Sequence, residues 1–412
     1  MKSQRVDKGS IRALFVAISL CVAAGGFYNA AGAADWPNYR GPDYNGITKE
    51  IDWKSNWGDS GPKVLWRKAI GMGFSSMAVA DGRVYAMGNQ GKTKDVVNCF
   101  DAVTGEEKWI HSYPCPLEPK YYEGGTLSTP TVDDDRVYTL SKMGSLYCLN
   151  AANGEVIWHK ELNKDMGYKH PTWHFSSSAL IVGDMLFLNI GDAGLAFDKN
   201  TGEQIWTNGK GQCGYATPVE FEIGGKRGLA IFGKNSIIAV SPVNGKQLWQ
   251  FPWVTKHDVN AADPIFFGNY VFISSGYNRG CALLEVNNGK AKKVWESRVM
   301  RNHMNCCVLY DGFLYGFDES TFKCISPMDG TEKWSERSLG KGALMMSADG
   351  RMIIMSDKGE LVIAQANPQQ FKALARAQVL PKKRCWTTPV LANGKIYARN
   401  AFGDMACVDA GR

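Results

Sequence analysis

After residue 33 the sequence lacks any long apolar run, and it lacks a concentrated excess of either charge. A membrane-spanning helix needs about 20 consecutive apolar residues, so no later segment is a candidate for one. The formal net charge of +7 falls to +4 without residues 1–33, because those residues include four basic side chains and one acid. No run of basic residues is interleaved with aromatic residues either. We therefore expect no nucleic-acid-binding surface.

The sequence also lacks the short motifs that accompany most catalytic and metal sites. It has no Cys-x-x-Cys-His haem attachment, no nucleophile elbow and no phosphate-binding loop. Only six histidines are present, and none has a metal-binding spacing; His170 and His174 are four residues apart, but Pro171 interrupts the segment. We expect these loop histidines to bond to water or to the backbone, and we expect no metal site.

Residues 1–33 have the pattern of a secretory signal peptide. A basic leader precedes an apolar run from Ala13 to Ala24, and Ala31-Gly32-Ala33 fits an A-x-A cleavage site. Leu20 is too large for a lipoprotein signal at Cys21, so lipidation is not expected. The sequence predicts a monomeric protein that is exported to the periplasm or released from the cell.

One motif is repeated along almost the whole chain. It begins with a Thr-Gly, Asn-Gly or Asp-Gly pair and reaches a tryptophan four residues after the glycine, as in Thr201-Gly202-Glu-Gln-Ile-Trp206. The glycine supplies the positive φ of a tight turn, and the indole provides apolar area worth roughly 3 kcal/mol when buried. Successive tryptophans of the repeat are separated by 39 to 49 residues; they are Trp66, Trp109, Trp158, Trp206, Trp249, Trp295 and Trp334.

A second series of turns has the same period. Repeats of ~40–50 residues that contain several short strands are typical of propeller blades. Each of these turns separates two short segments rich in β-forming residues, so each period holds four strands. The series predicts an all-β fold, an eight-bladed β-propeller of four-stranded antiparallel blades. Its turns are Asp81-Gly82, Asp134-Asp135, Gly183-Asp184, Gly224-Gly225, Gly268-Asn269, Asp311-Gly312, Asp349-Gly350 and Asn393-Gly394.

The last blade, from Cys385 to Gly411, has no tryptophan strand of its own. The strand around Trp66 has no partner strand before it, so we expect it to complete this blade and close the ring. One blade earlier, Leu374 is expected to occupy the position of the missing tryptophan. The only plausible helix in the sequence is a turn from Pro368 to Arg376. The predicted organisation is a signal peptide at 1–33, an ordered but irregular lead-in at 34–62 and the propeller at 63–412.

Ten cysteines remain after residue 33, and an exported protein is free to form disulfides. The sequence does not fix their pairing. Four of them occupy one position of the repeat, where two other copies have Ala196 and Ala239. A position that accepts either residue is small, buried and apolar, so we expect free thiols there. These four are Cys99, Cys148, Cys324 and Cys407.

The repeat resembles the PQQ-like β-propeller family, whose docking motif is A-x-D-x-x-T-G-[KE]-x-x-W. The segments Cys99–Trp109 and Ala196–Trp206 match it closely, and the lead-in Trp36-Pro37-x-Tyr39-Arg40-Gly41-Pro42 is similar to one in secreted bacterial members. One branch of the family contains enzymes that bind pyrroloquinoline quinone (PQQ) and calcium in the central funnel. The other contains binding scaffolds without a cofactor, such as the propeller lipoprotein of the outer-membrane β-barrel assembly machinery.

Cys306 and Cys307 bear on the enzyme branch. Its alcohol dehydrogenases have a disulfide between adjacent cysteines that lies against the quinone, so the resemblance implies a cofactor-binding role for this pair. Adjacent residues of a strand point to opposite faces, however, which favours two independent thiols. Candidate calcium ligands, which no spacing singles out, are Asn260, Asp263, Glu285 and Asn305. The chain also lacks the long insertions that usually build the cofactor pocket, so we expect no cofactor.

The long connections between blades all lead onto inner strands, so we expect them to meet at one end of the axis. They are Ser112 to Gly125, Lys160 to His174, Arg298 to Asn305 and Pro381 to Trp386. Aromatic side chains with a few cations around a concave opening suit a protein segment, a small molecule or a saccharide; alternatively, Trp173 and Trp386 only pack between blades. The candidate ligand-binding residues are Tyr121, Tyr122, Trp173, His174, Arg301, His303, Arg384 and Trp386.

The sequence therefore favours an exported, non-catalytic scaffold that binds a protein or a ligand at the mouth of the propeller. One alternative is a PQQ-dependent alcohol or sugar dehydrogenase that uses Cys306 and Cys307, with PQQ and calcium in the funnel. A second alternative is a polysaccharide-binding module.

Overall fold

The structure is a computed structural model that describes residues 34–58 and 60–411. The predicted signal peptide lies outside these residues. These described residues belong to one compact unit. Within the described part of this unit the regular structure consists of strands, and no helix there is long and apolar enough to cross a membrane.

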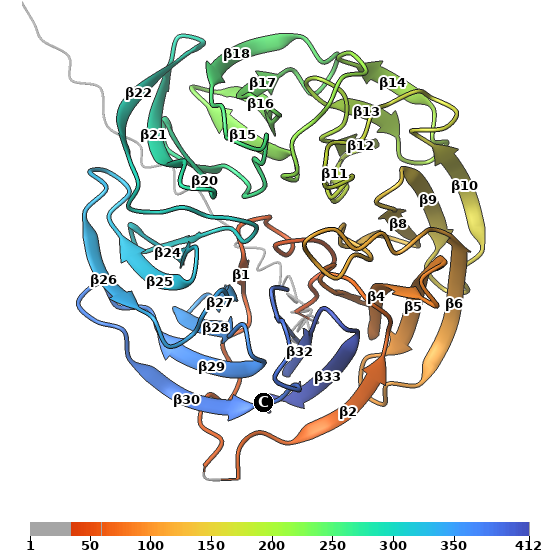
Figure 1. The fold of residues 1–412 in the computed structure, drawn as a ribbon, viewed down its shortest axis with the longest axis vertical. Coiled ribbons are helices and arrows are strands. Elements are labelled where there is room, and N and C mark those ends of the chain that lie inside the picture. Colours follow the sequence, from red (N-terminus) through yellow and green to blue (C-terminus); the bar gives the residue numbers. More distant parts are fainter. Residues whose placement is uncertain (1–33, 59, 412) are drawn as a thin grey trace, which may run out of the picture. The chain divides into compact units, whose positions relative to one another are not determined.

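Eight sheets of four antiparallel strands are arranged around a common axis, which confirms the predicted eight-bladed propeller (Figure 1). Blade 1 consists of β3 (Ala78–Ala80), β4 (Arg83–Gln90), β5 (Lys94–Asp101) and β6 (Glu107–Pro114). Blade 2 consists of β7 (Thr131–Asp133), β8 (Arg136–Leu140), β9 (Ser145–Asn150) and β10 (Val156–Glu161). Blade 3 consists of β11 (Leu180–Val182), β12 (Met185–Leu188), β13 (Leu195–Asp198) and β14 (Gln204–Thr207). Blade 4 consists of β15 (Val219–Ile223), β16 (Lys226–Phe232), β17 (Ser236–Val240) and β18 (Gln247–Pro252).

The second half of the ring repeats this order from the inner strand outward. Blade 5 consists of β19 (Ile265–Phe267), β20 (Tyr270–Ser275), β21 (Gly280–Asn287) and β22 (Lys290–Ser297). Blade 6 consists of β23 (Val308–Tyr310), β24 (Phe313–Asp318), β25 (Thr321–Ile325) and β26 (Glu332–Glu336). Blade 7 consists of β27 (Ala343–Ser347), β28 (Arg351–Met355), β29 (Glu360–Gln365) and β30 (Ala373–Gln378). Blade 8 consists of β31 (Val390–Ala392), β32 (Lys395–Arg399), β33 (Asp404–Asp409) and β2 (Val64–Ala69).

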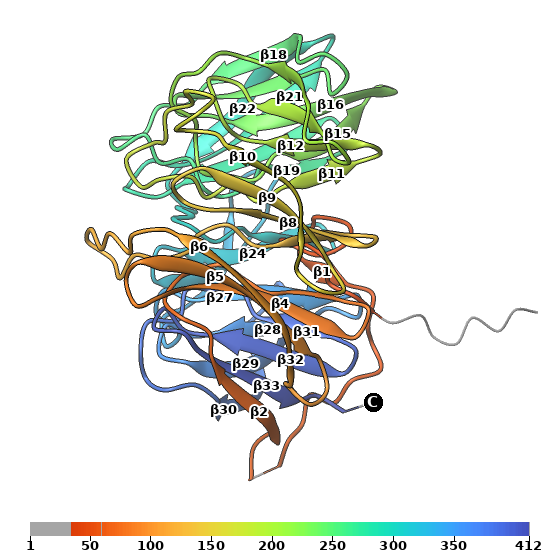
Figure 2. The same cartoon turned by 90° about the vertical axis from the view of Figure 1, so that its right-hand side faces the viewer.

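The ring closes as predicted, through the strand around Trp66. β2 pairs antiparallel with β33, and Trp66 lies opposite Cys407 (Figure 2). The first and last strands of the propeller thus share one sheet, so neither leaves an unpaired edge between blades 8 and 1.

The repeated motif joins neighbouring blades. The indole Nε1 of Trp206, on β14 of blade 3, donates to the carbonyl oxygen of Pro242 in the β17–β18 turn of blade 4 at 2.8 Å. In the same turn Gly245 has a φ of +71°, and a Cβ there would lie 2.6 Å from the Trp206 ring. The glycine is therefore required both by the turn and by the close approach of the preceding indole. The same indole contact occurs at Gly105, Gly154 and Gly202.

The repeat position opposite each tryptophan also follows from the register. Cys99 pairs with Trp109, Cys148 with Trp158 and Cys324 with Trp334. All ten cysteines of the described residues are buried free thiols. The prediction of free thiols at the repeat position is therefore confirmed.

Two expectations for blade 7 were wrong. The segment from Pro368 to Arg376 was expected to form a helix. Its last residues instead belong to the strand β30, which pairs antiparallel with β29. The tryptophan position is occupied by Ala375, opposite Ile363, whereas Leu374 is 41% exposed. Trp53 and Trp57 of the lead-in pack in the same core cluster as Ala375 and supply aromatic volume there.

The lead-in, residues 34–62, crosses the end of the ring opposite the long connections. Trp36 pairs with Val79 of β3, and Pro37 O accepts a hydrogen bond from Val132 N of β7. Further along, β1 (Ile47–Thr48) pairs parallel with the inner strand β27, on the inner side of the ring (Figure 1). The described part of the lead-in is mainly irregular, and it adds this fifth strand to blade 7.

Replacing Trp206 by Ala is expected to lower the free energy of unfolding by ~3–5 kcal/mol, because it leaves a cavity between blades 3 and 4. Ile205→Ala is the control, since Ile205 is the adjacent residue and is 46% exposed; it should change stability by about 0.5 kcal/mol or less. Urea unfolding of both variants measures the difference. Equal effects would contradict the assigned role of the indole.

Candidate functional site

A pocket of about 240 Å³ opens where the long connections meet. Each connection runs from the outer strand of one blade to the inner strand of the next, which carries it toward the axis. All four predicted connections contribute. They provide Lys120, Tyr121 and Tyr122, then Trp173, then His303, Met304 and Asn305, and finally Trp386.

The inner end of the pocket is encircled by a belt of hydrogen bonds between blades. Ser76 N donates to Thr129 Oγ1 at 3.0 Å, and Thr129 N donates to Ser178 Oγ at 3.0 Å. In the same way Ser178 N donates to Thr217 Oγ1 at 3.3 Å and Thr217 N donates to Asp263 Oδ1 at 2.8 Å. Asp263 N then donates to Cys306 Sγ at 3.1 Å. Each belt residue stands two positions before an inner strand. The belt therefore links six consecutive blades through backbone donors and short side chains.

Lead-in residues complete this inner end. Tyr39 lines the pocket, and its hydroxyl lies 3.7 Å from Cys306 Sγ. The neighbouring Arg40 is buried, with its Nε 3.9 Å from Asp263 Oδ2 and its two terminal nitrogens each 3.2 Å from the carbonyl oxygen of Cys307. The inner end of the pocket thus joins a carboxylate, a guanidinium, a phenol and a thiol from residues far apart in the sequence.

Burial dominates the ionisation of this cluster. It raises the pKa of Asp263 to about 6, against the smaller opposing effect of Arg40. It also raises the pKa values of Tyr39 and Cys306. Cys306 is therefore a protonated thiol and Tyr39 a neutral phenol near neutral pH, and neither has the lowered pKa of a reactive nucleophile.

Five of the eight candidate ligand-binding residues line the pocket. Tyr121 contacts Trp173 at 5.8 Å between ring centroids, and Trp173 contacts Tyr122 at 6.2 Å. Phe74, which the sequence did not single out, lies between Tyr122 at 5.7 Å and Trp386 at 5.8 Å. These rings form a continuous aromatic wall. That they bind a ligand stays a prediction.

His303 completes the lining as a neutral hydrogen-bond donor. Its Nδ1 lies 2.7 Å from Lys341 Nζ, which donates to it. Burial, followed by the charge of Lys341, lowers the pKa of His303 to about 4. Since Nδ1 accepts this hydrogen bond, the ring hydrogen is assigned to Nε2.

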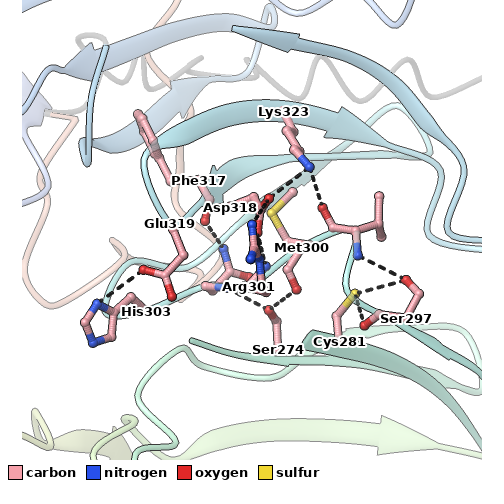
Figure 3. A network of polar contacts seen from close by, with 12 residues as sticks. Ser274, Cys281, Ser297, Met300, Arg301, His303, Phe317, Asp318, Glu319 and Lys323 are labelled. Carbon is pink, nitrogen blue, oxygen red and sulfur yellow. Dashed lines mark hydrogen bonds and ion pairs between the residues drawn. The ribbon is translucent and has the colours of Figure 1, made fainter. Parts of the chain in front are cut away.

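The structure places the other three candidates outside the pocket lining, where Arg301 and Arg384 form ion pairs and His174 forms a hydrogen bond with Glu118. Arg301 Nε and Nη2 donate to Asp318 Oδ1 and Oδ2 at 2.6 and 2.9 Å, and Lys323 joins the same carboxylate at 2.9 Å (Figure 3). Burial raises the pKa of Asp318, but the hydrogen bonds from Arg301 and Lys323 outweigh this effect, so the pKa is lowered overall. His174 pairs with Glu118 and Arg384 with Glu123, both at 2.7 Å.

Cys306 and Cys307 point to different surroundings. Cys306 Sγ accepts the belt hydrogen bond from Asp263 N, whereas Cys307 Sγ donates to Asn302 Oδ1 at 3.2 Å within the core. Across residues 34–58 and 60–411 no three His, Cys, Asp or Glu side chains are grouped to hold a metal ion. Two separate thiols do not supply the disulfide between adjacent cysteines that the enzyme branch places against its quinone.

The belt was missed in the sequence, although a signal for it exists. Three belt residues, and the corresponding residue of blade 8, precede a proline next to an inner strand. These pairs are Thr129-Pro130, Thr217-Pro218, Asp263-Pro264 and Thr388-Pro389. Proline favours an extended residue before it and suits the first position of a strand. The recurrence of a small polar residue before this proline marks the belt.

Comparison with known proteins gives the family. A family model described as outer membrane protein assembly factor BamB matches residues 93–336, which is more than half of the chain. The chain belongs to this family. Its PQQ-like repeats are the ones that the docking motif indicated.

The relatives are distant but cover most of the chain. The outer membrane protein assembly factor BamB of Shewanella oneidensis is 21% identical over 376 residues, covering 84% of this chain and 89% of the relative. BamB from Moraxella catarrhalis has a TM-score of 0.62 at 17% identity, covering 84% and 97% of the two chains. A europium-containing methanol dehydrogenase has a TM-score of 0.65 at 13% identity, covering 88% and 89%. At such identities the structural likeness establishes the fold alone.

The raised pKa of Asp263 predicts a pH-dependent stability. In the unfolded chain an aspartate has a pKa of about 3.9, so between about pH 4 and pH 6 the folded state binds the extra proton. The stability of the native protein relative to Asp263→Asn should therefore fall as pH rises through this window, by on the order of 2 kcal/mol, and level off above it. Urea unfolding between pH 4 and 8 measures it. A constant difference between the native protein and Asp263→Asn across this range would contradict the assignment.

Proposed function

We propose that this protein is an exported, non-catalytic propeller scaffold that holds a partner protein at the rim of the axial pocket. The family supports a scaffold, since it is that of an outer-membrane protein assembly factor. By that relationship the proposed location is the periplasmic side of the outer membrane. The pocket beneath the rim also suits small molecules, including saccharides.

Tyr121 is the observation that carries this proposal. Its side chain is 91% exposed, although it adjoins Trp173, and its φ of +62° is unusual for a bulky residue. Such backbone conformations cost of order 1–3 kcal/mol and are concentrated at functional sites. Exposed aromatic anchors beside a concave pocket are typical of the residues that dominate protein interfaces. Tyr121 is therefore the proposed contact with the partner.

A dehydrogenase is not favoured by any observation on the described residues. Cys306 and Cys307 are separate thiols, and the likeness to a methanol dehydrogenase is one of fold. Binding is therefore the function that this geometry supports best.

Site-specific photo-crosslinking tests the rim. A photoreactive phenylalanine analogue at position 121, introduced into the full-length protein in its own host, should give a discrete protein adduct. The matched control is position 243, because Val243 is 73% exposed in the β17–β18 turn at the opposite end of the blades. The adduct should be reduced by at least about tenfold in Trp173→Ala, as for an interface anchor worth 1.4 kcal/mol or more. Equal adducts from both positions, or none from 121, would count against the proposal.

A further inference from the structure

Beneath the aromatic rim, three hydroxyl-bearing residues of the belt line the axial pocket. The oxygens of Thr129, Ser178 and Thr217 each accept a backbone N–H from the preceding blade. A hydroxyl that accepts still has one O–H to donate. Within residues 34–58 and 60–411, none of these three hydroxyls donates to a protein acceptor, and all three residues line the pocket. They form an arc of donors around the axis.

Asp263 continues this arc as an acceptor. Its Oδ1 accepts Thr217 N at 2.8 Å, but Oδ2 has only the ion pair with Arg40 Nε at 3.9 Å, which exceeds hydrogen-bond distance. The side chain is 4% exposed and lines the pocket. A buried carboxylate oxygen without a close donor is costly, and a ligand hydroxyl at the axis would satisfy it.

The charges at the inner end of the pocket are balanced, which favours a neutral ligand there; the lining cation Lys120 lies instead at the rim, over the Trp173 ring at 5.7 Å. Arg40 offsets Asp263 at the inner end. At the rim, Lys341 pairs with Glu319 at 3.0 Å and Arg384 with Glu123 at 2.7 Å. At the inner end a cationic ligand would meet the Arg40 charge beside Asp263, and an anionic one would meet Asp263 itself, so neither gains an unengaged partner there.

The upper wall adds an apolar surface. Phe74 contacts both Tyr122 and Trp386, and the three rings line one side of the pocket. The pocket volume of about 240 Å³ lies below the ~300–1,000 Å³ of sites for drug-sized ligands, so it suits one small ring. A sugar ring combines an apolar C–H face with an edge of hydroxyls that both donate and accept, which matches the wall and the arc.

We propose that the axial pocket binds one terminal residue of a neutral saccharide. Its apolar face lies against Phe74 and Trp386, and its hydroxyls bond to Ser178, Thr217 and Asp263. This site goes beyond the partner protein at the rim, because it uses the inner end of the pocket and does not depend on Tyr121.

Calorimetry and ligand-detected NMR on the mature protein test this with the methyl glycosides of glucose, galactose, mannose and N-acetylglucosamine at millimolar concentration. Choline, glucuronate and cyclohexanol are the cationic, anionic and hydroxyl-poor comparisons. At least one neutral glycoside should bind, at least about tenfold more tightly than all three comparisons. Ser178→Ala and Thr217→Val should each weaken its binding by about two- to tenfold, as loss of a neutral hydrogen bond does, and Asp263→Asn by about tenfold or more.

Thr139→Val is the matched control for Thr217→Val. Thr139 is a buried threonine of blade 2 whose hydroxyl has no partner and which is outside the pocket lining; its replacement should leave glycoside binding unchanged. Absence of binding by all four glycosides, equal binding of choline or glucuronate, or insensitivity to Ser178→Ala, Thr217→Val and Asp263→Asn would each overturn the proposal. Photo-crosslinking from position 121 is expected to persist in Thr217→Val, so failure of the saccharide site is distinguishable from failure of the rim.

Discussion

The contact between an indole and the glycine of the next blade is the interaction on which the rest of the structure depends. Trp206 closes over Gly245 and bonds to Pro242 O, and the same arrangement recurs around the ring. A four-stranded blade has two large faces and cannot bury both alone. Because each docking contact fixes the next blade, it also fixes where the inner strands begin. The hydrogen-bonded belt and the axial pocket follow from that placement.

Most of the fold was predictable because its determinants are local and repeated. A tight turn with glycine and a tryptophan four residues later can be recognised wherever they occur, and eight hairpin turns gave the number of blades. Blade 7 was misassigned because its solution is non-local. Ala375 leaves the tryptophan position small, and Trp53 and Trp57, more than three hundred residues earlier, pack in the same cluster. No local pattern around residue 375 indicates that compensation.

The site was less predictable for the same physical reason. Chain direction sufficed to bring the four connections together, and hence Tyr121, Trp173, His303 and Trp386 into one pocket. It did not show that Arg301 and Arg384 are neutralised by Asp318 and Glu123, because a charged residue's partner depends on three-dimensional neighbours. Asp263 was one of several acids with no distinguishing spacing. Its position in the belt becomes evident only in the structure, where corresponding residues of neighbouring blades can be compared.

The contact between Tyr39 and Cys306 joins residues 267 positions apart. β2 pairs with β33, which lies more than three hundred residues further along the chain. Contacts this distant in sequence form slowly, since much chain must be ordered before they are made. While the protein is being synthesised, β2 has no partner strand until β33, more than three hundred residues later, has emerged. The inner end of the pocket therefore exists only in the finished, closed ring, and a partner or ligand that recognises it distinguishes complete molecules from unfinished ones.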